Sequence, residues 1–238
     1  MKTQQQKRVL DITLKRDELG RTIGGGLPLN SLILLEGPDG AGKSLISQRM
    51  SYGLLQNNST VSYLSTELNT QGFIQQMASL NYDIKYDMLD QKLFFISLFP
   101  FYGQGKLKTK NFLDTLLECK ELFKSEVIVF DTLSFLLVDD NLSQEDAFFF
   151  LTFLKRLNSL DKTVIIAVDP DQINTHLLTL IRSSCDVIME LQMREFAGQP
   201  VRIMSVKRFK RAGGEVTPSI PFRVEPGKGL VIEIVSFS

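Results

Sequence analysis

Cysteine and histidine are scarce in this 238-residue sequence, which has two cysteines and one histidine. Two cysteines do not build a disulfide framework, so a reducing compartment is the default expectation. Cys119 shares a predicted helical stripe with apolar residues and is expected to be a buried, inert thiol. His176 has no cysteine or histidine partner at ligand spacing, so we expect no metal site built on these residues. The chain also lacks the nucleophile elbow of Ser/His/Asp hydrolases.

The sequence also has no excess of positively or negatively charged residues. The 27 Lys and Arg residues balance 27 Asp and Glu residues, which gives a formal net charge of zero. A surface built mainly to neutralise a nucleic-acid backbone would be basic, so the balance argues against that class.

No apolar run is long enough to cross a bilayer. The most apolar stretch, residues 93–102, is too short for a span and contains Pro100. The polar residues 1–8 are followed by no apolar segment, so we expect no signal peptide. If the protein meets a membrane, we therefore expect a partner to bring it there.

Short apolar runs alternate with longer segments of helical periodicity. The runs typical of buried strands cover residues 31–37, 60–67, 92–98, 126–131 and 163–169. The helical segments cover residues 43–56, 70–80, 109–123, 143–160 and 172–182. Further strand-like runs follow at residues 185–192, 201–208, 221–226 and 229–235. This order predicts one α/β domain over residues 1–238, with a mostly parallel sheet flanked by helices and an antiparallel C-terminal strand extension.

A glycine-rich loop lies between the first predicted strand and the first predicted helix. Its sequence, GPDGAGKS, fits the phosphate-binding pattern G-x-x-x-x-G-K-S. Glycines let the backbone N–H groups turn toward phosphate oxygens, and the helix N-terminus adds a positive dipole end. The expected nucleotide-binding residues are Gly37, Pro38, Asp39, Gly40, Ala41, Gly42, Lys43 and Ser44. Lys43 would reach the β- and γ-phosphates of ATP, and the Ser44 hydroxyl would bind Mg²⁺.

An aspartate ends the fourth predicted strand. Asp131 follows four apolar residues and would hold Mg²⁺ through water or through the Ser44 shell. A helix or turn cap is the alternative. The next residue is Thr132, so P-loop enzymes with a water-activating Glu at that place are a poor match. A catalytic base would have to come from elsewhere.

The best candidate for that base is Glu67, at the end of the second predicted strand. The carboxyl ends of parallel strands open on one edge of a sheet, where ligands bind. Glu67 would therefore face the γ-phosphate and could orient or deprotonate water. A surface glutamate or a helix N-cap is the alternative. Asp169 lies at the same edge and is either a polar sensor of the nucleotide or a cap of the helix after Pro170.

Several segments together resemble one family. "LGRTIGGGLPLNSLILLEGPDGAGKS" looks like the entry segment of the KaiC/RadA branch of RecA-like ATPases. With "YLSTE", "VFDTLSFLL", "VKRFKRAGG" and "PFRVEPGKGLVIEI", the chain is similar to the accessory ATP-binding protein H family of the archaeal flagellum, or archaellum (FlaH/ArlH). The resemblance runs from about residue 10 to the end, and the "PFRVEPGKG" block separates this family from other P-loop proteins.

The resemblance implies a RecA-type fold that binds ATP with Mg²⁺ and can form hexameric rings. It implies a cytoplasmic accessory component at the inner membrane face, docked there through its partners beneath the archaellum motor ATPase at the membrane platform protein. Motility-switch proteins are the implied neighbours. The family is usually described as binding nucleotide with weak or no turnover, so binding would regulate assembly. The alternative is an active RecA- or KaiC-like ATPase, recombinase-like or an autokinase, with Glu67 as base. Whether the protein is an enzyme stays open.

The basic segment Val206–Arg211 departs from the Lys-x-Arg finger of active KaiC-type proteins. Lys207, Arg208 and Lys210 are expected to contact a neighbouring subunit or its nucleotide. A finger acting in trans can contribute orders of magnitude in rate, so an altered one fits weak turnover. Nucleic-acid binding is not expected because the cluster holds a single aromatic residue, Phe209. A solvated strand end is the other alternative.

One phenylalanine falls on the polar side of the helix predicted over residues 143–160. The apolar side of this helix, at 100° per residue, is formed by Phe149, Phe150, Phe153, Leu154 and Leu157. Phe148 lies near Thr152 and Lys155 instead. We expect Phe148 to contact a subunit or partner, and burial under a neighbouring loop is the alternative.

Overall fold

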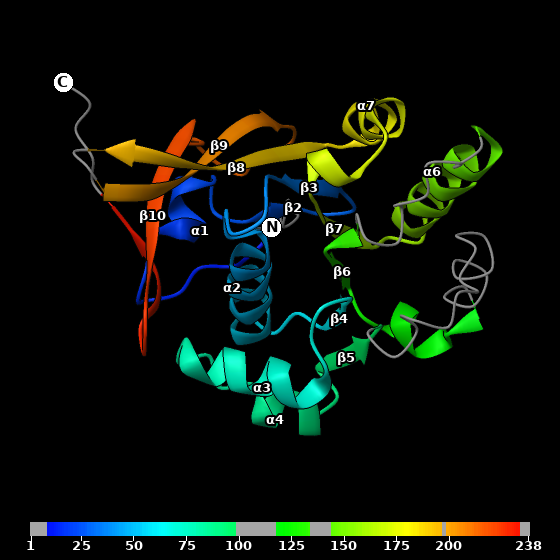
Figure 1. The fold of residues 1–238 in the computed structure, drawn as a ribbon. Coiled ribbons are helices and arrows are strands. Elements are labelled where there is room, and N and C mark those ends of the chain that lie inside the picture. The colour runs from blue at the N-terminus through cyan, green and yellow to red at the C-terminus, as the bar shows by residue number, and fades with distance from the viewer. Residues whose placement is uncertain (1–8, 99–117, 134–143, 197–198, 234–238) are drawn as a thin grey trace, which may run out of the picture.

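A nine-stranded sheet runs through the described part of the chain, with helices on both of its faces (Figure 1). The computed structural model describes residues 9–98, 118–133, 144–196 and 199–233. The strand order is β11-β10-β9-β8-β3-β7-β6-β4-β5. Neighbouring strands from β8 to β5 are parallel, whereas β9, β10 and β11 pair antiparallel. The predicted fold class, with its antiparallel C-terminal extension, is confirmed.

The bounds of the elements follow the sequence pattern closely. The strands are β1 (Val9–Leu10), β2 (Leu27–Pro28), β3 (Leu32–Glu36), β4 (Val61–Ser65), β5 (Leu93–Ser97), β6 (Val127–Asp131), β7 (Thr163–Val168), β8 (Val187–Phe196), β9 (Gln199–Phe209), β10 (Ser219–Glu225) and β11 (Gly229–Ile232). The α-helices are α1 (Leu19–Thr22), α2 (Lys43–Gln56), α3 (Thr70–Ser79), α4 (Lys85–Leu89), α6 (Gln144–Ser159) and α7 (Thr175–Ser184). Two 3₁₀ helices cover Lys120–Lys124 and Pro170–Gln172.

Alternate residues of the central strands enter two separate hydrophobic cores. In β3, Ile33 and Leu35 face one core, and Leu32 and Leu34 face the other. A strand covered on both faces must be apolar at every position, which is why the central strands read as continuous hydrophobic runs. The first core is closed by α2 and α3, and the second by α6 and α7.

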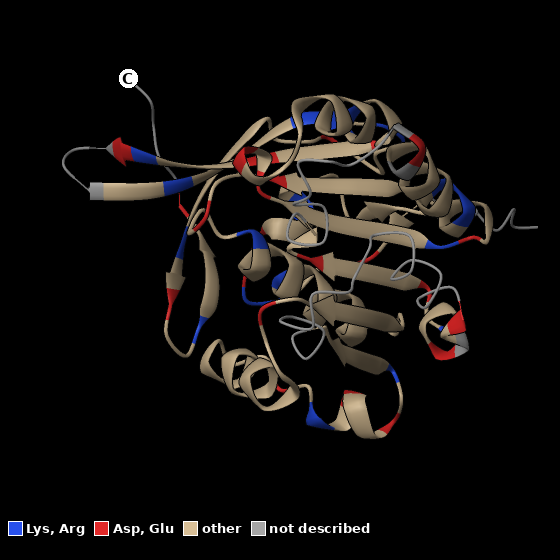
Figure 2. Ribbon diagram, turned by 45° about the vertical axis from the view of Figure 1, so that its right-hand side comes forward, with Lys and Arg blue, Asp and Glu red and all other residues tan. Residues whose placement is uncertain are grey.

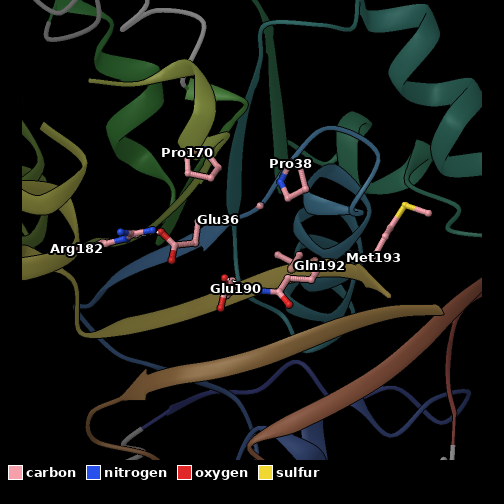
Figure 3. Close-up of a pocket in the computed structure, with 9 residues that line it drawn as sticks. Glu36, Pro38, Pro170, Arg182, Glu190, Gln192 and Met193 are labelled. Carbon is pink, nitrogen blue, oxygen red and sulfur yellow. Dashed lines mark hydrogen bonds and ion pairs between the residues drawn. The ribbon is translucent and has the colours of Figure 1, made fainter. Parts of the chain in front are cut away.

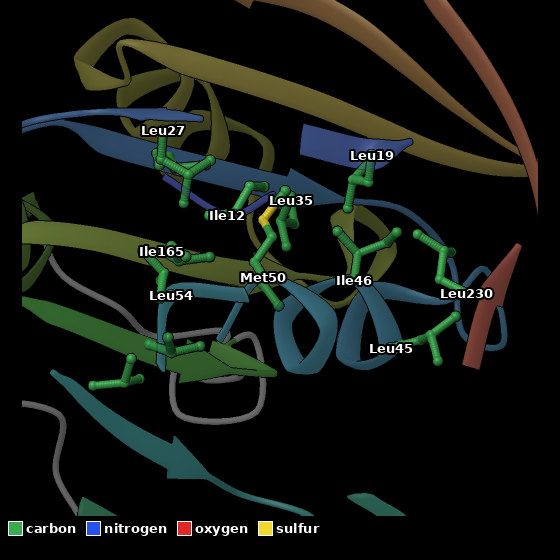
Figure 4. Close-up of a cluster of buried hydrophobic side chains, with 14 of the residues drawn as sticks. Ile12, Leu19, Leu27, Leu35, Leu45, Ile46, Met50, Leu54, Ile165 and Leu230 are labelled. Atoms are coloured by element: carbon green, nitrogen blue, oxygen red, sulfur yellow. The ribbon is translucent and has the colours of Figure 1, made fainter. Parts of the chain in front are cut away.

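Helix α2 carries much of the first core. Ile46, Met50 and Leu54 are fully buried and lie against side chains of β3 and β7 (Figure 4). The first residue of this helix is Lys43, so packing of its apolar face also fixes the end of the phosphate-binding loop.

Some sequence predictions differ from the structure or lie outside it. Most of the helix predicted over residues 109–123 and the loop at 101–110 lie outside the described residues, and Lys120–Lys124 is a 3₁₀ helix. The helix predicted over 172–182 begins later, at Thr175, because the Asp169 side chain caps a 3₁₀ turn and the Asn174 side chain then caps α7. The pairing of β1 with β2 and helix α4 were not predicted.

Charged residues of both signs are interspersed along the ribbon (Figure 2). Among the described residues, no helix combines the length and the apolar character that a membrane span requires.

A buried ion pair fastens the N-terminal segment to α2. Arg49 donates from Nε and Nη2 to the two carboxylate oxygens of Asp17, at 2.6 Å each. Its Nη1 donates to the Ile12 carbonyl oxygen at 3.0 Å. Both side chains are almost completely buried, so each charge depends on the other for compensation.

We predict that Arg49→Met strongly destabilises the protein, because the Asp17 carboxylate would stay buried without its partner. The expected loss is about 3–5 kcal/mol in the free energy of unfolding, measured by urea denaturation. Arg21→Met is the matched control, since Arg21 pairs with Glu18 on the surface at 3.1 Å and should cost less than about 1 kcal/mol. Equal losses in the two variants would contradict the role of the buried pair.

Candidate functional site

The loop from Gly37 to Ser44 joins β3 to α2 at the carboxyl edge of the parallel sheet. Gly40 and Gly42 have φ angles of 73° and 101°, in the left-handed region that glycine adopts without strain. A Cβ atom on Gly37 would overlap the backbone carbonyl of Leu191 on β8. Glycine is therefore required at Gly37 by close approach and at Gly42 by backbone conformation.

The lysine of the loop is buried and turned back over the loop. Its Nζ donates to the carbonyl oxygens of Gly37, at 2.8 Å, and Pro38, at 2.9 Å. Lys43 is also the first residue of α2, where the first N–H groups have no carbonyl partner one turn earlier. An ammonium group and free N–H donors thus converge at one place, which is the arrangement that binds anions.

Asp131, at the end of β6, is held from the neighbouring strand. The hydroxyl of Tyr63 on β4 donates to Asp131 Oδ2 at 2.7 Å. Asp131 Oδ1 is buried and has no hydrogen-bond partner among the described residues. Burial raises the pKa of Asp131 to about 6, although the hydrogen bond from Tyr63 and the nearby Ser44 hydroxyl act to lower it. Burial, and then the nearby Asp131 charge, raises the pKa of Tyr63 well above its usual value, so the phenol stays a donor.

A cavity of about 220 Å³ brings the predicted residues together. Its wall includes Lys43, Ser44 and Glu67, and also Thr132 directly after Asp131. Glu67 is exposed toward solvent. Thr132 has a φ of 62°, which is rare for a β-branched residue and typical of functional sites. Its Oγ1 is buried without a hydrogen-bond partner among the described residues.

Sequence reasoning missed Arg202, which lies on β9 and completes the same cavity. Its Nε donates to the Gly40 carbonyl oxygen at 3.1 Å. Phe222, which pairs with Arg202 in the β9–β10 ladder, lies beside Gly42. The C-terminal extension therefore closes over the loop. Arg202 is distant in sequence, and only the sheet pairing brings it here.

A second cavity, of about 310 Å³, lies beside the start of the loop, at Gly37 and Pro38 (Figure 3). It is lined by Glu36, Gly37, Pro38, Pro170, Arg182, Glu190, Leu191, Gln192 and Met193. Arg182 Nε pairs with Glu36 Oε2 at 2.8 Å, and Lys207 Nζ pairs with Glu190 Oε2 at 2.8 Å. The acidic groups of this cavity are thus already matched by cations.

The remaining predicted residues lie away from the first cavity. Asp169 caps the turn that follows it, accepting from Asp171 N at 3.0 Å. Arg208 Nη1 donates to the Arg182 and Cys185 carbonyl oxygens at the end of α7, and Lys210 lies 3.7 Å from Asp186. Phe148 on α6 has 63% of its surface exposed. Its role as a contact, like that of the basic cluster, stays a prediction.

The donor set suits a magnesium ion that also binds phosphate. Mg²⁺ prefers oxygen ligands, keeps several waters, and is commonly held by one or two protein groups together with phosphates. The Ser44 hydroxyl lies close enough to Asp131 to lower its pKa, and Asp131 Oδ1 is the buried oxygen without a partner. These two groups fit the protein's share of such a site.

The parallel sheet, the phosphate-binding loop and the strand-end aspartate define a RecA-like P-loop protein. The family model described as "ATPase: KaiC" matches residues 14–235. A KaiC-like protein from Pyrococcus horikoshii OT3 shares the fold, with a TM-score of 0.75 at 16% identity, covering 95% of this chain and 99% of that one.

Relatives of higher sequence identity place the chain in one family within this class of protein. The archaeal flagellar ATP-binding protein FlaH of Methanocaldococcus jannaschii is 37% identical over 225 residues, which cover 94% of this chain and 96% of the relative. FlaH of Methanococcus voltae is 32% identical, with 94% and 97% covered. The crystal structure of the flagellar accessory protein FlaH from M. jannaschii superposes with a TM-score of 0.87, at 36% identity, over 95% of this chain and 100% of that one. The chain belongs to the FlaH family of KaiC-type proteins, which confirms the resemblance seen in its motifs.

Proposed function

We propose that the chain is a single ATP-binding domain that takes ATP with Mg²⁺ in the 220 Å³ cavity. The observation that carries this proposal is the meeting of Lys43, Ser44 and Glu67 in one cavity, beside the buried free oxygen of Asp131. The FlaH relatives are themselves described as ATP-binding, which supports it.

ATP binding would replace hydrogen bonds that the loop makes with itself. The Lys43 ammonium would break its hydrogen bonds to the Gly37 and Pro38 carbonyl oxygens and form charge-assisted hydrogen bonds to phosphate oxygens. The N-terminus of α2 would add its N–H donors. Ser44 and Asp131 would hold the ion, which neutralises phosphate charge when bound. Arg202, with its Nη groups, would add a second cation on the outer side of the loop.

The biological role we propose is that of an accessory component of the archaellum. The relatives are described as flagellar proteins, and the expected partners are the motor ATPase, the membrane platform protein, the motility-switch proteins and further copies in a hexameric ring. The protein would act in the cytoplasm, at the inner membrane face through these partners. Bound ATP would order the surface that meets them, which requires different affinities for the two conformations.

Hydrolysis would be weak or absent. Thr132 occupies the place after Asp131 where some P-loop enzymes carry a glutamate, and Arg208 is engaged by the carbonyl oxygens at the end of α7. Lys207 and Lys210 are each about half exposed and could exchange their acidic partners for a neighbouring subunit or its nucleotide.

A catalytic ATPase is the second candidate function. Glu67 favours it, because this exposed carboxylate lines the same cavity as Lys43 and Ser44. A base at this position could act on a water beside the γ-phosphate.

We expect Lys43→Ala to weaken ATP binding by roughly tenfold or more, since a charge-assisted hydrogen bond contributes about 1.5–3 kcal/mol. Isothermal titration with Mg²⁺ and ATP measures the affinity, and Lys85→Ala, at an exposed position of α4, is the control.

Asp131→Asn should weaken ATP binding in the same way as Lys43→Ala. Both variants should also lose binding to the motor ATPase, and loss of nucleotide without loss of the partner would refute the coupling.

Glu67→Gln separates the two candidate functions. The accessory role predicts tight ATP binding and turnover near background in both the wild-type chain and the variant, far below the roughly 10 s⁻¹ of a typical enzyme. Phosphate release and ATP affinity would be measured on the same samples. Fast wild-type turnover that is lost in Glu67→Gln would establish the catalytic alternative instead.

Phe148→Ser should reduce self-assembly or partner binding without lowering stability, because the side chain is 63% exposed and adds little to the core. Light scattering after gel filtration in the presence of ATP measures assembly. Leu160→Ser, at a residue that is 53% exposed just after α6, is the control for loss of an exposed apolar side chain. Unchanged assembly in Phe148→Ser would count against the contact.

A further inference from the structure

The two oxygens of the Asp131 carboxylate have different surroundings. Oδ2 accepts a hydrogen bond of 2.7 Å from the Tyr63 hydroxyl, while Oδ1 is buried without a partner among the described residues. Rotation of the carboxylate about its Cβ–Cγ bond would break the contact with Tyr63 and move Oδ1. Something must therefore hold its orientation, and the donor on Oδ2 is the group that does so.

Tyr63 is built into the structure rigidly. Its side chain is completely buried, and its ring centroid lies 4.8 Å from that of Phe73 on α3 and 6.2 Å from that of Phe95 on β5. The rings of Phe73 and Phe95 stack on each other at 4.3 Å. A fully buried phenol packed beside two stacked rings has little room for another rotamer in a close-packed interior, so its hydroxyl has a fixed position.

The side chain nearest this hydroxyl on the cavity side is Gln48, which acts to lower the pKa of Tyr63. Its Oε1 accepts from Gln76 Nε2 at 3.1 Å, and its Nε2 makes no hydrogen bond among the described residues. Gln76 itself lines the 220 Å³ cavity. Within the described part of the chain, the hydrogen bond that reaches the Asp131 carboxylate therefore comes from Tyr63 alone.

We propose that Tyr63 is a positioning residue for the divalent cation of the bound nucleotide: its hydroxyl holds Asp131 so that Oδ1 faces the cation. This inference rests on the proposed binding of ATP with Mg²⁺. Tyr63 does not touch the nucleotide and acts only through the carboxylate. Groups that orient metal ligands in this way typically change metal affinity by about 10–100-fold when they are removed.

The test is Tyr63→Phe, which removes the hydroxyl and keeps the ring. ATP affinity is measured by isothermal titration in excess MgCl₂ and again in EDTA. We expect the affinity in Mg²⁺ to fall roughly tenfold or more, and the affinity in EDTA to stay unchanged. Tyr82→Phe is the matched control, because it also removes a buried hydroxyl, one that accepts from Leu230 N at 3.1 Å, and it should leave both affinities unchanged.

The outcomes separate the inference from the function on which it rests. A wild-type chain that binds ATP no better with Mg²⁺ than with EDTA would overturn the proposed metal site itself. A metal-dependent wild-type chain whose Tyr63→Phe variant keeps that dependence, or loses affinity equally in both buffers, would overturn the positioning role alone.

A double-mutant cycle gives an independent readout. If Tyr63 acts through Asp131, Tyr63→Phe should have no further effect on ATP affinity in an Asp131→Ala background, because the two changes are then not additive. Additive losses would overturn the inference. If Tyr63→Phe does not fold, Phe73→Leu loosens the packing against the ring of Tyr63, and its loss of affinity should likewise be confined to the Mg²⁺ condition.

Discussion

The register between β4 and β6 is the constraint on which the site depends. It sets Ser65 opposite Asp131 and Tyr63 opposite Val129. The end of β4 therefore lies beside the carboxylate at the end of β6, which accepts a hydrogen bond from Tyr63. A slip of one residue would turn Tyr63 to the other face of the sheet and remove the donor from Asp131. Because both strands are buried on both faces, packing against two cores holds this register.

The loop is braced on three sides by residues far away in sequence. Leu191 on β8 leaves no room for a side chain at Gly37, Arg202 on β9 holds the Gly40 carbonyl, and Phe222 on β10 lies beside Gly42. The antiparallel extension is therefore part of the site. On the opposite side, the Arg49–Asp17 pair ties α2 to the N-terminal segment, so the helix that begins at Lys43 cannot shift alone.

Local pattern was enough to predict the loop, the strands of the parallel sheet and the place of Asp131. Each rests on a short stretch of sequence: a continuous apolar run, a glycine spacing, or an acid after apolar residues. Tyr63 was not found because an aromatic residue inside a strand reads as core, and nothing local tells that its hydroxyl meets a carboxylate 68 positions later. Arg202 was missed for the same reason, since its contact with Gly40 spans 162 positions. The partners of Lys207, Arg208 and Lys210 could not be predicted either. A basic run in the sequence does not indicate which carboxylates or carbonyl oxygens the fold brings next to it.

Those partners bear on how a nucleotide could change the protein. Glu36 directly precedes Gly37 and lies opposite Glu190 in the β3–β8 register; Arg182 binds the first and Lys207 the second. The loop edge is therefore joined through ion pairs to α7 and to β9. A ligand shifts a conformational equilibrium only where its contacts differ between two states. Here the Lys43 ammonium donates hydrogen bonds to the carbonyl oxygens of Gly37 and Pro38, which directly follow Glu36 in the chain. In the proposed complex with ATP, movement of that ammonium to a phosphate would change the charge balance where α7 and β9 are joined to the loop edge. Occupancy of the cavity would then be linked to the surface that carries Lys207.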